Sequence, residues 1–87
     1  MNNYEKDSTE ILDIPVIFHG LGANTVSYAS QSIPGGLTVT PSVDAGGKKA
    51  TLLVSGGTYP NTYDCKVYFN VSNGARRVAR FTITMRA

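Results

Sequence analysis

The sequence is short of the residues that many binding and catalytic sites need. Its 87 residues include no tryptophan, one cysteine and one histidine, and eight Lys and Arg against six Asp and Glu leave a net charge of +2. A single cysteine excludes an internal disulfide, so the chain is not a small secreted scaffold held by disulfides. A charge of +2 is too small to indicate a nucleic-acid-binding protein by itself.

The same scarcity bears on catalysis and metal binding. His19 lies in a glycine-flanked stretch with no Asp or Cys partner in register, so a nucleophilic triad has no relay. One histidine and one cysteine do not make a zinc site. Gly46-Gly47-Lys48 resembles a phosphate-binding loop but lacks the full spacing of that motif. We therefore expect no enzyme activity, no catalytic residues, no metal and no cofactor.

Long apolar runs are also missing. A membrane-crossing helix needs about 18 or more consecutive apolar residues, and the amino terminus does not resemble a signal peptide. We expect no membrane partner, and synthesis in a reducing compartment like the cytosol, where Cys65 stays a free thiol.

What the chain does have is a strict alternation of apolar and polar residues in its last third. Apolar side chains recur at every second position from Tyr63 to Val71; after Ser72-Asn73-Gly74 the alternation resumes at Arg77, with Ala79, Phe81, Ile83 and Met85 on the apolar face. This period predicts two strands that share one apolar face, and Asn-Gly favours a tight turn between them. Cys65 falls in the apolar register, which indicates a buried structural thiol. The predicted core of the hairpin is Tyr63, Cys65, Val67, Phe69, Phe81 and Ile83.

Shorter apolar segments predict the other strands, near residues 11–18, 25–33, 37–40 and 49–55, with glycine- and proline-rich turns between them. Pro15 lacks a backbone donor, which predicts an edge strand or a switch between sheets. Tyr63 follows a glycine-rich corner and precedes Cys65 by two residues, which is typical of immunoglobulin-like sandwiches, where this hydroxyl bonds back to the corner backbone. The predicted fold is an all-β, immunoglobulin-like β-sandwich of about six to seven antiparallel strands without a disulfide.

The charges are divided along the chain. Residues 1–10 are polar and show no apolar period, which predicts an N-terminal arm, mobile or docked on another surface, before a single domain over residues 11–87. Acidic residues near this arm could meet a basic face of the hairpin on a neighbouring copy, beside Tyr68. Pairing within one molecule, and nucleic-acid binding by the basic face, are the alternatives. The candidate partner contacts are Glu5, Asp7, Glu10, Asp13, Lys66, Arg76, Arg80 and Arg86.

The order of several short motifs resembles a family of tailed-bacteriophage virion proteins. The motifs are Lys6-Asp7, Leu12-Asp13, Ile33-Pro34-Gly35-Gly36-Leu37, Leu53-Val54-Ser55-Gly56-Gly57-Thr58 and Thr62-Tyr63, with a last strand through Arg80. They are similar to those of fiber-tail adaptor proteins, which are single immunoglobulin-like sandwiches that join pieces of the tail apparatus. The chain differs from that pattern in having Ser8, Ile14 and no tryptophan.

The resemblance implies a non-enzymatic structural protein that links the tail fiber to the tail or neck. It implies a multi-copy assembly with tail, fiber, portal-adaptor or capsid subunits as partners, in a virion whose proteins are made in the bacterial cytoplasm. Two other functions stay open. One is a capsid decoration protein that binds the head. The other is a small carbohydrate or host-receptor binding module that uses Tyr59 and Tyr68 to stack on a sugar.

Overall fold

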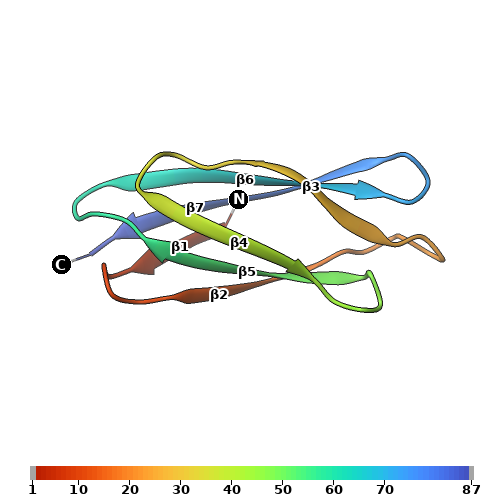
Figure 1. Cartoon of the computed structure of the whole chain (residues 1–87), viewed down its shortest axis with the longest axis horizontal. Coiled ribbons are helices and arrows are strands. Elements are labelled where there is room, and N and C mark those ends of the chain that lie inside the picture. Colours follow the sequence, from red (N-terminus) through yellow and green to blue (C-terminus); the bar gives the residue numbers. More distant parts are fainter. Residues whose placement is uncertain (1, 87) are drawn as a thin grey trace.

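The computed structural model describes residues 2–86 as two packed β-sheets (Figure 1). The first sheet has the order β1-β7-β6-β3 and the second has the order β2-β5-β4, which confirms the predicted all-β class. The described residues include no helix that could span a membrane. The strands are β1 (Asn2–Lys6), β2 (Leu12–Ile17), β3 (Val26–Ser32), β4 (Leu37–Val43), β5 (Lys49–Gly56), β6 (Thr62–Val71) and β7 (Arg76–Met85).

The predicted hairpin forms the centre of the first sheet. β6 and β7 pair antiparallel from Thr62 opposite Thr84 to Asn70 opposite Arg76. Burial of the Cys65 side chain raises the pKa of its thiol to about 11, which agrees with the predicted structural cysteine. The six predicted core residues are all buried, with at most 6% of their surface exposed: Tyr63, Cys65, Val67, Phe69, Phe81 and Ile83.

The second sheet covers the apolar face of this hairpin. Ile14 of β2, Val39 of β4 and Leu52 of β5 contribute buried side chains from their strands. β2 is an edge strand, one of the two positions that Pro15 predicts, and pairs only with β5 within its sheet. β4 runs on past the predicted end at residue 40, through Pro41, because β4 is the opposite edge strand and an edge tolerates a residue without a backbone donor.

The predicted N-terminal arm is wrong for residues 2–6, which form β1 and belong to the first sheet. β1 lies parallel to β7, with Asn2 opposite Phe81 and Lys6 opposite Met85, so the expectation of antiparallel strands alone is also wrong. Tyr4 and Lys6 occupy inward positions of β1: Lys6 is buried, and Tyr4 is partly buried against the core. With a lysine at one of them, the segment has no apolar alternation from which a strand could be recognised.

The sandwich is elongated, with extents of 44 × 19 × 18 Å. One end gathers the β1–β2 turn, the β3–β4 connection, the β5–β6 corner and the end of β7 (Figure 1). The opposite end gathers the β2–β3 and β4–β5 loops and the turn of the β6–β7 hairpin. The charged residues that the sequence singles out are therefore distributed along a long molecule.

Candidate interaction surfaces

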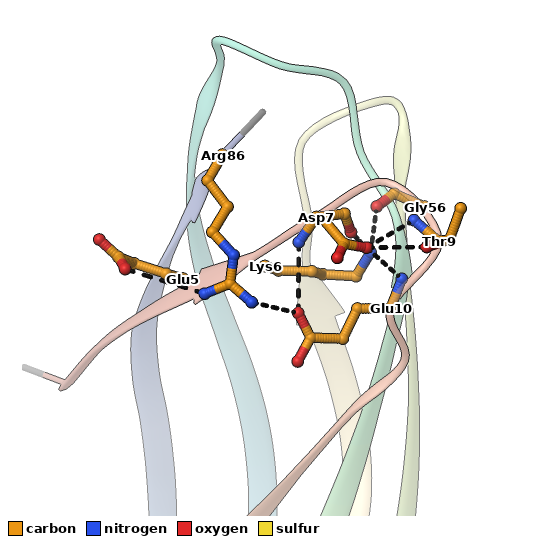
Figure 2. A network of polar contacts seen from close by, with 7 residues as sticks. All are labelled: Glu5, Lys6, Asp7, Thr9, Glu10, Gly56 and Arg86. Carbon is orange, nitrogen blue, oxygen red and sulfur yellow. Dashed lines mark hydrogen bonds and ion pairs between the residues drawn. The ribbon is translucent and has the colours of Figure 1, made fainter.

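Lys6 is a buried lysine that joins the two sheets. Its side chain is 0% exposed, and Nζ donates hydrogen bonds to the carbonyl oxygens of Asp7, at 2.8 Å, and of Gly56, at 2.7 Å (Figure 2). Gly56 ends β5 in the second sheet, whereas Lys6 ends β1 in the first. A buried ammonium group of this kind is tolerated only where acceptors compensate for the lost water, and here two carbonyls accept hydrogen bonds from two of its three N–H groups. The Lys6 side chain thus has a structural role.

The turn after β1 is organised by the carboxylate of Asp7. Oδ1 accepts hydrogen bonds from the Thr9 amide at 2.9 Å, the Thr9 hydroxyl at 2.9 Å and the Glu10 amide at 2.8 Å. The side-chain hydrogen bond from Thr9, followed by the backbone bond from Thr9, holds the pKa of the Asp7 carboxyl below its ordinary value. Aspartate that accepts bonds from the next residues is typical of tight turns. Asp7 therefore shapes the link from β1 to β2.

Arg86 brings part of the acidic and basic sets together within one chain. Nη2 lies 3.0 Å from Oε1 of Glu10, and Nη1 lies 3.9 Å from Oε2 of Glu5 (Figure 2). These side chains are partly or largely exposed, so the pairs contribute little to stability. This is the intramolecular pairing that the sequence left open as an alternative. Asp13 lies elsewhere, exposed on β2 and opposite Leu53 in the β2–β5 register.

The other three basic candidates lie on the outer face of the β6–β7 hairpin. Lys66 and Arg80 are exposed and directly opposite each other in the register. The guanidinium of Arg76 lies over the ring of Tyr68, 5.9 Å from its centroid. Like charges on opposite positions of neighbouring strands repel, so an acidic partner that lies between them gains electrostatic energy. We refer to Lys66, Arg76 and Arg80 as the basic face.

An open cleft of about 480 Å³ lies between the edges of β2 and β7. Two of its lining residues, Ile17 and Val78, are large apolar side chains with 63% and 39% exposure. The motifs and strand patterns of the sequence did not predict this cleft. The sequence does contain one indication of it: Ile17 and Val78 are large apolar residues at strand positions that alternate with the core positions and so face outward. Its walls are Ile14, Pro15, Val16 and Ile17 of β2 and Val78, Ala79, Arg80 and Phe81 of β7, with Tyr4 of β1.

The remaining predicted positions have structural or solvent-exposed environments. The Tyr63 hydroxyl accepts a hydrogen bond from the Thr58 amide at 3.1 Å, which confirms the predicted tie to the corner backbone. His19 is exposed, and its carbonyl oxygen accepts a hydrogen bond from Nη2 of Arg77 at 2.8 Å. Within residues 2–86, no three His, Cys, Asp or Glu side chains gather as a metal-ligand set.

Comparison with protein-family models, with curated proteins and with solved structures gives no match for this chain.

Proposed function

We propose that this chain is a non-enzymatic structural protein of a tailed-bacteriophage virion, an adaptor that links the tail fiber to the tail or neck apparatus through protein contacts. The observation that carries the proposal is the place of the motifs that resemble the adaptor family. Lys6 reaches Gly56, and Thr58 donates to the hydroxyl of Tyr63, at one end of the sandwich. Motifs that lie far apart in the sequence are thus in contact at one end of the folded domain. This is expected if the resemblance reflects a shared fold.

The proposal includes an immunoglobulin-like topology. In immunoglobulin sandwiches the second, fifth and fourth strands share one sheet, and the third, sixth and seventh share the other. The orders β2-β5-β4 and β7-β6-β3 support this assignment. The first strand differs, because β1 pairs with β7 instead of β2. Tyr63 gives further support: it lies near the start of β6, two residues before Cys65, and bonds to the corner backbone as the tyrosine of these domains does.

In this proposal the adaptor works as a rigid connector whose surfaces bind neighbouring virion subunits. Glu5 and Glu10 already contact Arg86 of the same chain. We therefore place the main electrostatic contact on the basic face, with an acidic surface of another subunit as its partner. Asp13, on the far sheet, is then available to a different neighbour.

The location is tested on particles of the phage that encodes the chain. Mass spectrometry of purified virions should detect the protein, and immunogold labelling should place it at the tail or neck. Label spread over the head would instead favour the capsid decoration protein. Absence of the protein from purified particles would contradict a virion role of either kind.

Multi-copy assembly has a separate test, which is the molar mass of the purified protein by light scattering over rising concentration, at low and at high salt. A defined oligomer that weakens with salt would support contacts between acidic and basic surfaces of neighbouring copies. A monomer under all conditions would contradict self-assembly and leave a different protein as the partner.

A further inference from the structure

One edge of β7 is paired along only half of its length. β1 lies beside Phe81–Met85, whereas β6 pairs with β7 on the other side from Arg76 to Thr84. Among residues 2–86, no strand pairs with Arg76–Arg80 on the side where β1 lies. At about 3.4 Å per residue, this free edge is long enough for an added strand of roughly five residues.

The hydrogen bonds show which backbone groups face the free side. The Val71 amide donates to the Ala75 carbonyl at 2.8 Å, and the Met85 amide donates to the Asn61 carbonyl at 3.0 Å, at the two ends of the β6–β7 ladder. Bonded pairs alternate along an antiparallel ladder, so the odd-numbered positions of β7 face β6 and the even-numbered ones face away. The Arg86 amide, which donates to the Lys6 carbonyl at 2.9 Å, follows the same alternation. Val78 therefore directs its backbone N–H and C=O toward the free side.

The free edge opens onto the cleft between β2 and β7. Val16 and Ile17 form apolar parts of its β2 wall, and Val78 and Phe81 form apolar parts of its β7 wall. Beyond Val78, the hydrogen bond from Arg77 to the His19 carbonyl holds the loop after β2 against β7. A strand laid along this edge would thus bury side chains on one of its faces in the cleft while its backbone pairs with Val78.

The positive charge near the free edge determines which kind of strand can bind there. Among the lining residues that the structure describes, Arg80 is the only formally charged one, and Lys66 lies directly opposite it in the register. Charged residues at a free edge discourage pairing with the same edge of a second copy, because like charges would meet. The same cations favour a strand that carries carboxylates.

We propose that the free edge of β7 at Val78 binds an extended segment of a partner protein in which apolar and acidic residues alternate. The segment adds to the first sheet in line with β1, its apolar side chains enter the cleft, and its carboxylates lie beside Arg80 on the outer face. This inference stands on the edge, the cleft and the charge, and it does not depend on the virion assignment.

The test uses the full chain, labelled with nitrogen-15, and a capped peptide of alternating valine and glutamate, six residues long. Titration should shift the backbone amide signals of Val78 and Arg80, and of Val16 and Ile17 across the cleft, with saturation. A peptide of alternating valine and lysine is the control for charge, and it should not produce these shifts.

Two pairs of variants separate the contributions of charge and edge. Arg80→Glu should weaken binding by about ten-fold or more, which is the effect of losing roughly 1.4 kcal/mol. Lys66→Glu changes the net charge equally but lies outside the cleft lining, so it should weaken binding less. Val78→Pro removes the donor on the free side, and with it the amide signal of residue 78, without removing a bond to β6; it should abolish the shifts of Arg80, Val16 and Ile17. Val78→Thr keeps the donor and should retain them.

Several outcomes would overturn the proposal. The first is the absence of shifts at Val78 and Arg80 with peptide on the order of 1 mM, the weak end of measurable affinities. The second is equal loss of binding in Arg80→Glu and Lys66→Glu, because this would indicate general charge attraction without a site. The third is shifts at Val78 that follow protein concentration without any peptide, which would make a second copy the occupant.

Discussion

The two halves of β7 follow the same alternation but have different neighbours. From Phe81 to Met85 the strand lies between β1 and β6, and its inward side chains are at most 3% exposed. From Arg76 to Arg80 it has β6 on one side and the open cleft on the other, and Val78 is 39% exposed. The period of a strand sets which side chains face the core. Whether the edge of β7 is paired depends on a different segment: β1 reaches only Phe81–Met85.

Amide hydrogen exchange should show the largest difference between the two halves. In the free half of β7 (Arg76–Arg80), we expect the amide of Val78 to exchange at least about a hundred-fold faster than that of Ala79. Only the Ala79 amide faces β6, so its exchange requires the core to open. In the covered half (Phe81–Met85), the amide of Thr84 faces β1 and should be protected from exchange, as should that of Ile83. Exchange of Thr84 as fast as that of Val78 would mean that β1 does not stay on β7 in solution.

Truncation of a side chain should lower the free energy of unfolding much more in the covered half of β7 than in the free half. Ile83 is 0% exposed, so Ile83→Ala removes buried methyl groups and leaves a cavity, at an expected cost of about 3 kcal/mol. Val78→Ala in the free half should cost less than about 1 kcal/mol, because much of that side chain is in solvent. Urea unfolding of both variants measures the difference. Similar costs would contradict the assignment of the two positions to core and edge.

Replacement of Lys6 tests how β1 is held on the covered half. Lys6→Met keeps most of the apolar stem but leaves the carbonyls of Asp7 and Gly56 without this donor, at an expected cost of about 2 kcal/mol. Arg80→Met also removes one positive charge, from an exposed position, and should change stability by less than about 0.5 kcal/mol. Thermal unfolding at equal ionic strength compares the two. Equal, small effects would contradict a structural role for Lys6.

The sequence was sufficient for the hairpin, because apolar residues alternate from Tyr63 to Val71 and from Ala79 to Met85, and all of these except the half-buried Ala79 are buried. Pro15, which cannot donate to a ladder, limited β2 to an edge strand or a switch between sheets, and the structure has the edge strand. These are local properties, in which each residue type limits its own backbone or its own face.

The sequence was not sufficient for β1 or for the cleft. The sequence pattern marks Lys6 as a polar residue, and one of the two carbonyls that accept hydrogen bonds from its buried Nζ belongs to Gly56, 50 residues away in the chain. The pairing of Arg86 with Glu10 has the same origin, because their sequence separation of 76 residues gives no local signal. The cleft depends on the residue at which β1 meets β7, and composition does not determine this.

The smallest expected effect concerns the corner that faces the covered half. Tyr63 lies opposite Ile83, and its hydroxyl accepts the hydrogen bond from Thr58, so Tyr63→Phe should cost about 1 kcal/mol through loss of that acceptor. Tyr68 lies opposite Val78 in the free half, and the guanidinium of Arg76 lies over its ring. Tyr68→Phe keeps the ring and should change the free energy of unfolding by less than about 0.5 kcal/mol. Because the two substitutions are chemically identical and lie on the same strand, urea unfolding of this pair isolates the contribution of position. Equal costs would show that the corner bond adds nothing to the stability of the covered half, and that the packing of Ile83 and its neighbours alone accounts for the difference.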